Sequence, residues 1–291
     1  MKKAILFFTL LGFLVPFGIA QEAPTTSLLW EITGKKVKSP SYLFGTMHLI
    51  PKESFLFPES LQEKVKGSDI LVMEIGGLSE QMKALPLMML ESGSLFDLFT
   101  EPQLDSLFAY TEEKLGFNEE QMRLSFGKMK PIVLLQLFSK EQFGEDPESY
   151  EMSLEQIARK ESIEIMGLET IEEQIGFLDN LSPEDQVNMI MESIRNEDDD
   201  TMLNESLKLV EIYLSQDIEK IYEYVSQSDM SSEEFEEEML TKRNQNWIQP
   251  IQKIIRKNKA FIAVGAAHLG GPEGVIELLR KKGYTLTPVN L

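Results

Sequence analysis

The sequence of 291 residues contains no cysteine and only two histidines. Without cysteine the chain can form no disulfide, no thiolate nucleophile and no cysteine-ligated metal site, so its stability must come from its core. The chain is long enough to bury a large core in one sizeable domain or two small ones. The two histidines are candidates for chemistry, because imidazole binds metals and transfers protons near neutral pH.

Basic residues are scarce relative to acidic ones. The sequence has 28 Lys and Arg against 48 Asp and Glu, which gives a formal net charge of −20. Nucleic acids and anionic membrane surfaces attract basic proteins, so the acidity argues against both as partners. The sequence also lacks a P-loop, a dinucleotide-binding fingerprint, a Gly-x-Ser-x-Gly elbow and a His-Glu-x-x-His helix. The enzyme classes that depend on these motifs are therefore not indicated.

Long hydrophobic runs are absent after the N-terminal segment. In that segment Lys2 and Lys3 precede an uncharged apolar run that ends with the small residues Gly18-Ile19-Ala20. This pattern predicts a signal peptide over residues 1–20 and a mature chain of residues 21–291. The alternative is an uncleaved anchor, although the run is at the short end of the roughly 17–25 residues that a spanning helix needs. We expect an exported protein, periplasmic or extracellular, with no stable membrane span after cleavage.

Short apolar runs near both chain ends predict strands, and a long middle region predicts helices. A polar connection between the first two runs indicates a hairpin, and a further strand is expected within the helical region. The predicted strands are residues 28–33, 41–45, 70–73, 163–166, 260–265 and 284–289, and the helices that follow the second and fifth strands are residues 58–66 and 272–282.

Both histidines lie in the same four-residue frame at the end of a predicted strand. The frames are Gly45-Thr46-Met47-His48 and Gly265-Ala266-Ala267-His268, and each is followed by a helix and another strand. We predict a single α/β domain with a mixed central sheet, built from two pseudo-repeat strand–helix–strand units at the chain ends and a large helical insertion at about residues 79–257. Such an arrangement brings His48 and His268 into one cleft. The alternative is two core histidines bonded to the backbone.

Two carboxylates follow buried strands in the same way. Glu74 comes after four apolar residues, and Glu169 follows the predicted strand near residue 165. Two imidazoles and a carboxylate form a set that binds divalent metals, so His48, His268 and Glu74 are the predicted metal ligands. Either Glu74 or Glu169 could ligate metal while the other acts as a general base. The structural alternative for each carboxylate is a helix cap or a surface ion pair.

Arg243 and Asn244 interrupt an apolar helical stripe near the second histidine frame. Leu240, Ile248 and Ile251 share the face on which Asn244 lies. A buried amide needs hydrogen-bond partners, so we expect Asn244 to bond a residue or loop of the site. We expect Arg243 to reach the rim of the cleft and bind a carboxylate or oxyanion of the substrate. A surface salt bridge from Arg243 is the alternative.

The frames and their neighbours together resemble the TraB/GumN family, which includes the Tiki proteases. The matching segments are Leu29-Trp30, Tyr42 to His48, Glu74, Gly167-Leu168-Glu169-Thr170 with Gln174, Arg243-Asn244 with Trp247, and Gly265 to Leu269. Tiki proteins resemble metal-dependent proteases that use two Gly-x-x-His histidines and a glutamate. The wider fold group resembles erythromycin esterases and a haem-binding protein.

The residues and the resemblance together predict an exported metal-dependent hydrolase, most simply a peptidase. A divalent ion (Mn, Co or Zn) held by His48, His268 and Glu74 would activate water for attack on a peptide or small-molecule substrate. Two alternatives remain open. One is a non-catalytic protein that binds haem, metal or a small ligand with the same histidines, and the other is a peptide-sequestering module without metal. The sequence does not determine the metal, the substrate or the oligomeric state.

Overall fold

The computed structural model describes residues 25–34, 36–77, 80, 83–142, 146–195, 201–227 and 233–291. The predicted signal peptide, residues 1–20, lies outside these ranges, and its cleavage remains a prediction. In the described part of the chain, no helix has the length and apolar character that crossing a membrane requires.

A six-stranded sheet forms the centre of the fold, with the strand order β4-β3-β5-β2-β1-β6. The strands are β1 (Leu29–Gly34), β2 (Ser41–Thr46), β3 (Ile70–Met73), β4 (Glu164–Gly167), β5 (Ala260–Gly265) and β6 (Tyr284–Val289). β2 and β3 flank β5 and pair with it in parallel, and β4 pairs in parallel with β3. β1 is antiparallel to both β2 and β6, which confirms the predicted hairpin and the mixed sheet.

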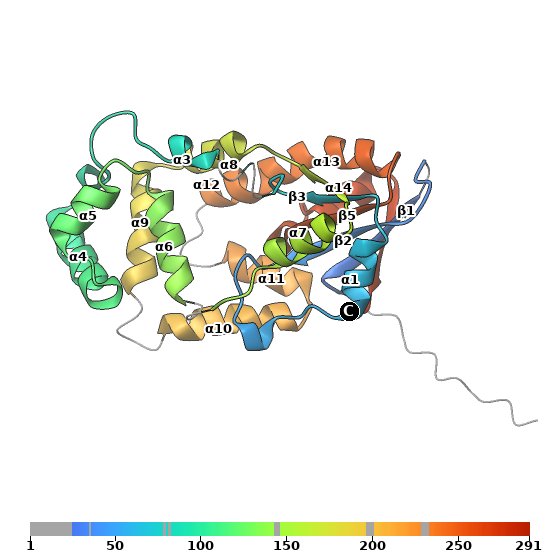
Figure 1. Cartoon of the computed structure of the whole chain (residues 1–291), viewed down its shortest axis with the longest axis horizontal. Coiled ribbons are helices and arrows are strands. Elements are labelled where there is room, and N and C mark those ends of the chain that lie inside the picture. Colours follow the sequence, from blue (N-terminus) through green and yellow to red (C-terminus); the bar gives the residue numbers. More distant parts are fainter. Residues whose placement is uncertain are drawn as a thin grey trace, which may run out of the picture.

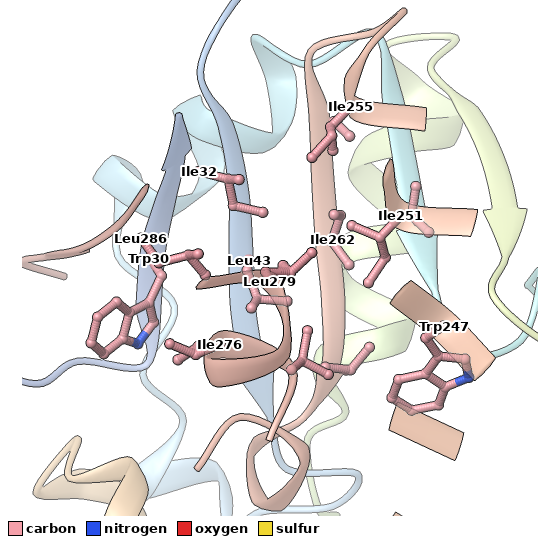
Figure 2. Packing of buried hydrophobic residues seen from close by; sticks show 14 of the residues in the cluster. Trp30, Ile32, Leu43, Trp247, Ile251, Ile255, Ile262, Ile276, Leu279 and Leu286 are labelled. Atoms are coloured by element: carbon pink, nitrogen blue, oxygen red, sulfur yellow. The ribbon is translucent and has the colours of Figure 1, made fainter. Parts of the chain in front are cut away.

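The central strands are apolar on both sides because helices cover both faces of the sheet. β2 and β3 are buried along their whole length, and β5 is buried from Ala260 to Val264. On one face α13 (Lys242–Ile255) and α14 (Val275–Lys281) pack on a cluster in which Ile262 of β5 is central and Trp30 and Trp247 lie on opposite sides (Figure 2). On the other face the sheet packs against α1 (Glu59–Lys66), α7 (Tyr150–Lys160) and α10 (Thr201–Leu214).

The middle of the chain forms a second, helical core. Leu107, Phe138 and Ile190 are among its fully buried members. The helices that build it lie to the left of the sheet in Figure 1 and are α4 (Glu101–Leu115), α5 (Glu119–Phe126), α6 (Ile132–Gln142) and α9 (Pro183–Arg195). Other α-helices in the described part of this region are α3 (Ala84–Leu87), α8 (Ile171–Asp179), α11 (Ile218–Ser226) and α12 (Glu233–Glu236). The predicted insertion is therefore mostly helical, and it also supplies β4 to the sheet.

The elements at the chain ends lie within a few residues of their predicted bounds. The clearest difference is the last helix, predicted from residue 272, which begins at Val275. Gly271 has a positive φ of 78°, and Gly274 caps the helix in an extended conformation, so the preceding residues form a turn. The helices that follow the two histidine frames, α1 and α14, cover opposite faces of the sheet. The pseudo-repeat relation between the two units remains a prediction.

The stability of the sheet should depend on its central strand. Ile262 is completely buried in β5, and we expect Ile262→Ala to lower the free energy of unfolding by about 2–5 kcal/mol, because it leaves a cavity. Leu124→Ala is the control, since Leu124 is 87% exposed, and it should change stability by less than about 0.5 kcal/mol. Both tryptophans lie in the cluster around Ile262, so their fluorescence during urea denaturation reports on this core. Equal effects of the two substitutions would contradict this assignment of the core.

Candidate functional site

The carboxyl ends of β2, β3 and β5 meet at one edge of the sheet, which is where α/β proteins place ligands. Thr46 at the end of β2 is paired with Gly265 at the end of β5. Glu74 directly follows β3, and His268 closes a short 3₁₀ turn directly after β5. His48 lies two residues beyond β2. The parallel pairing of neighbouring strands therefore brings the two histidine frames and Glu74 to the same edge.

The glycines of the two frames allow close approach at this edge. A Cβ atom on Gly45 would lie 3.0 Å from the Cα of Ala266, so the first frame packs directly against the second. A Cβ atom on Gly265 would lie 3.3 Å from Oε1 of Glu74 and 3.4 Å from the ring of His268. A side chain at Gly45 would push the two frames apart, and one at Gly265 would fit tightly against Glu74.

Two buried carboxylates share the centre of the site. The backbone N–H of Gly265 donates to Oε1 of Glu74 at 2.7 Å. The indole N–H of Trp247 donates to Oε2 of Glu169 at 3.0 Å. The amide of Gln174, from α8, donates to both carboxylates at 3.2–3.3 Å. Both carboxylates point inward, as the sequence predicts for strand-end acids.

Arg243 of α13 lies between the two carboxylates and uses all five of its N–H groups. Its Nε donates to Glu169, and its Nη2 donates to Oε1 of Glu169 at 2.7 Å and to Oε2 of Glu74 at 2.5 Å. Its Nη1 contacts the carbonyl oxygen of Met239 at 3.1 Å and Nε2 of His268 at 3.3 Å. The expectation that Arg243 reaches the rim is wrong, because the side chain is buried and no donor is left for a substrate.

Asn244 determines the orientation and tautomer of His268. Its amide nitrogen donates to the carbonyl oxygen of Glu273 at 2.9 Å, so its Oδ1 is turned toward Nδ1 of His268 at 2.7 Å. An amide oxygen only accepts, so Nδ1 of His268 carries the proton and Nε2 keeps a lone pair. That lone pair lies 3.3 Å from Nη1 of Arg243 and 3.8 Å from Oε1 of Glu74. The predicted hydrogen bond from Asn244 to the site is confirmed.

His48 has a different environment from His268. Its side chain is 70% exposed, whereas that of His268 is 6% exposed. Its Nδ1 lies 3.1 Å from Oε1 of Glu151, a residue in the first turn of α7. The same carboxylate oxygen accepts from the hydroxyl of Thr46 at 2.8 Å. The first histidine is thus held by a carboxylate at the surface, and the second by an amide in the interior.

Charge and burial shift the pKa values of the site in opposite directions. Burial and the nearby charge of Arg243 lower the pKa of His268 to about 3, so this imidazole is neutral at physiological pH. Burial alone would raise the pKa of Glu74, but Arg243 and the two histidines outweigh it and hold that pKa well below its usual range. Burial raises the pKa of Glu169, which Arg243 only partly offsets. Glu151 raises the pKa of His48.

The predicted metal ligands are brought together only in part. Glu74 and His268 lie side by side, while His48 is bonded to Glu151. Among the residues that the structure describes, no three His, Asp or Glu side chains converge as a ready-made metal site. The cluster of Glu74, Glu169, Arg243 and His268 contains two carboxylates, one guanidinium and one neutral imidazole, so it has more acids than cations.

The family model described as TraB/PrgY/gumN matches residues 28–288, nearly the whole chain. The chain belongs to the TraB/PrgY/gumN family. No curated protein and no solved structure gave a significant match. Family membership therefore supports the resemblance drawn from the two histidine frames, and the activity has to be argued from the site itself.

Within this TraB/PrgY/gumN chain, sequence reasoning did not identify Glu151 as part of the site, and it placed Arg243 at the rim instead of in the interior. Glu151 is one of 48 acidic residues, and no local pattern distinguishes it. Its helix, α7, lies far from the first frame in the sequence and returns to it only through tertiary packing. Gln174 and Trp247 were noted only as part of the family resemblance, and the structure shows that both donate to buried carboxylates.

Removing the guanidinium should destabilise the fold strongly. We expect Arg243→Met to lower the free energy of unfolding by about 3–5 kcal/mol at pH 7, since it leaves Glu74 and Glu169 buried without a cation. Lys83→Met is the control. Its ion pair with Glu80 is exposed, so we expect a loss of about 0–1 kcal/mol. Urea denaturation of both variants measures the difference.

The penalty in Arg243→Met should shrink as the pH falls. In the wild type the pKa of Glu74 is below its ordinary value of 4.5, so its ionisation stabilises the fold above about pH 4.5 and this contribution is lost on acidification. In the variant both buried carboxyls would have raised pKa values, so protonation favours the fold. A penalty that stays constant from pH 7 to pH 4.5 would contradict the ion-pair assignment.

The two imidazoles should titrate in different pH ranges. We expect His268 to remain neutral down to about pH 4, because its pKa is lowered to about 3. We expect His48 to titrate above its ordinary value of 6.5, because Glu151 favours the charged ring. An NMR pH titration resolves both, since the chain has only two histidines, and His48→Asn assigns the signals. Two imidazoles with the same ordinary pKa would contradict this description of the site.

Proposed function

We propose that this protein is an exported, metal-dependent hydrolase of peptide or small-molecule bonds, with its active site at the carboxyl ends of β2, β3 and β5. The observation that carries the proposal is the position of His268. The imidazole of His268 is neutral, and its Nε2 atom lies 3.8 Å from Oε1 of Glu74. The strand that leads to His268, β5, pairs with β2, which leads to His48.

The residues at this edge fit a divalent ion in three respects. First-row metals bind nitrogen and oxygen ligands at about 2.0–2.2 Å, so two atoms 3.8 Å apart can contact one ion. His268 donates its other ring N–H to Asn244, which is the usual arrangement of a metal-ligating histidine. The buried excess of carboxylates over cations also favours a bound cation. His48, whose Nδ1 is held by Glu151, would supply its Nε2 as the third ligand.

The two carboxylates differ in the hydrogen bonds that their oxygens accept. Both oxygens of Glu169 accept hydrogen bonds from Arg243, and they also accept from Trp247 and Gln174. In contrast, Oε1 of Glu74 accepts a hydrogen bond from the backbone N–H of Gly265 and lies 3.8 Å from Nε2 of His268. We assign Glu74 to the reacting centre, as a ligand or as acceptor of a water proton, and Glu169 to holding Arg243 in place.

A bound divalent ion would lower the pKa of a water molecule and polarise the carbonyl group of the substrate. The chain's own contribution is to hold that site in a fixed geometry. Arg243 keeps Glu74 ionised and in position, and Asn244 keeps Nε2 of His268 unprotonated. The 3.3 Å contact of Nε2 with Nη1 of Arg243 would be replaced when Nε2 binds an ion. Because Arg243 has no free N–H group, we do not assign it a contact with the substrate.

A second candidate is a non-catalytic protein that binds haem, metal or a small ligand through the same histidines. The observation that favours it is the exposure of His48, whose side chain is 70% exposed and is accessible to a bound group. A haem absorbance band after haem addition, without peptide turnover under any metal, would support this candidate.

The proposal is tested by measuring the metal content of the purified protein together with cleavage of a peptide library, with and without chelator. We expect cleavage that chelator abolishes and that added Mn²⁺, Co²⁺ or Zn²⁺ restores. Glu74→Gln should lower the rate by about 10²–10⁴-fold while the protein stays folded by circular dichroism. Cleavage that persists in chelator would refute metal dependence, and normal turnover by Glu74→Gln alongside failure of Glu169→Gln would reverse the roles of the two carboxylates.

A further inference from the structure

Glu151 joins the helical insertion to the first histidine frame. It lies in the first turn of α7, and its Oε1 contacts both Nδ1 of His48 at 3.1 Å and the hydroxyl of Thr46 at 2.8 Å. Its Oε2 accepts from the hydroxyl of Ser149 at 3.1 Å. The carboxylate therefore has donors on both oxygens, which restrict its rotation.

These contacts determine which ring nitrogen of His48 is free. An ionised carboxylate only accepts hydrogen bonds, so Nδ1 of His48 must carry a proton and Nε2 is left without one when the ring is neutral. We propose that Glu151 is a positioning residue that fixes the tautomer and direction of the His48 ring, so that Nε2 serves the site. This inference rests on the proposed function, in which His48 is one of the ligands.

The two frames reach the same tautomer by different means. His268 donates Nδ1–H to the amide oxygen of Asn244, and the second frame has Ala266 at the position that Thr46 occupies in the first. Thr46 is needed only in the first frame, where its hydroxyl holds the carboxylate of Glu151. This difference explains why a hydroxyl residue follows Gly45 and a methyl side chain follows Gly265.

The insertion also holds the backbone of the first frame. The hydroxyl of Tyr213, from α10, donates to the carbonyl oxygen of Gly45 at 3.0 Å. Tyr213 is buried and lies against Tyr150 of α7, with ring centroids 5.8 Å apart. The ring of His48 and the backbone of its frame are thus both positioned by helices of the insertion.

The His48–Glu151 pair should contribute little to stability, which separates a positioning role from a structural one. The two side chains are 70% and 24% exposed, and exposed ion pairs add only about 0–1 kcal/mol to the free energy of unfolding. Replacing Glu151 should therefore leave the fold intact while it changes the ring of His48.

NMR of the full chain tests the proposal directly, because only two imidazoles are present. Above the pKa of His48, the ¹⁵N shifts of each neutral ring report which nitrogen carries the proton. We expect Nδ1–H on both rings in the wild type. Glu151→Ala should move His48 toward the Nε2–H form and leave His268 unchanged. Thr46→Val, which keeps the carboxylate but removes its hydroxyl donor, should produce a smaller change in the same direction.

Glu161→Gln is the matched control, since it removes one negative charge from the exposed C-terminal end of the same helix. We expect it to leave both rings unchanged. A wild-type His48 in the Nε2–H form, or a His48 tautomer that Glu151→Ala does not alter, would overturn the proposal. Circular dichroism melting curves of each variant confirm that the fold is intact.

A zinc titration followed on the same signals separates this proposal from the proposed function. We expect Zn²⁺ to shift Nε2 of His48 and of His268, and Glu151→Ala to require at least about 10-fold more zinc for the His48 shift. A wild-type protein in which zinc shifts neither ring would refute the metal site, and the tautomer measurement would still decide the role of Glu151. Equal zinc dependence in Glu151→Ala and the wild type would overturn the positioning role.

Discussion

The site depends on one buried guanidinium. Arg243 joins α13 to the residues after β3 and β4 and to the turn after β5, because its N–H groups contact Glu74, Glu169 and His268. Burying the two carboxylates without a cation would be costly, and Arg243 supplies the cation that contacts both. Among the described residues no buried side-chain polar atom is left without a partner. The strand ends can therefore bring carboxylates and imidazole together in the interior because one cation bonds all of them.

The position of this cation follows from the packing of α13. Trp247, Ile251 and Ile255 of that helix are buried against the sheet, which fixes the rotation of the helix about its axis. Arg243 lies one turn before Trp247 and stacks over its ring at 5.0 Å from the centroid. The apolar face of α13 thus sets where the guanidinium lies, and the guanidinium in turn sets the charge state of Glu74. The ionisation of Glu74 therefore depends on the packing of α13 on the sheet.

The sequence predicts the local parts of this arrangement better than the long-range ones. The strands, the hairpin and the two histidine frames follow from apolar runs and glycine spacing, and Glu74 and Glu169 were placed correctly at strand ends. The role of Arg243 was not predictable, because an arginine in a helix has no local sign of whether it faces solvent or two acids. Glu151 was missed for a related reason. It lies 103 residues from His48 in the sequence, and it contacts His48 only because of the way α7 packs.

The two halves of the site therefore have different physical requirements. The half around His268 is buried, and its groups hold one another through contacts that the fold needs for stability. The half around His48 is exposed, and its geometry depends on Glu151 and Tyr213 from the insertion. A buried, neutral imidazole gives a fixed lone pair, whereas an exposed imidazole beside a carboxylate can change charge. The sheet accordingly supplies the rigid part of the site, and the helical insertion controls the part that can respond to a ligand.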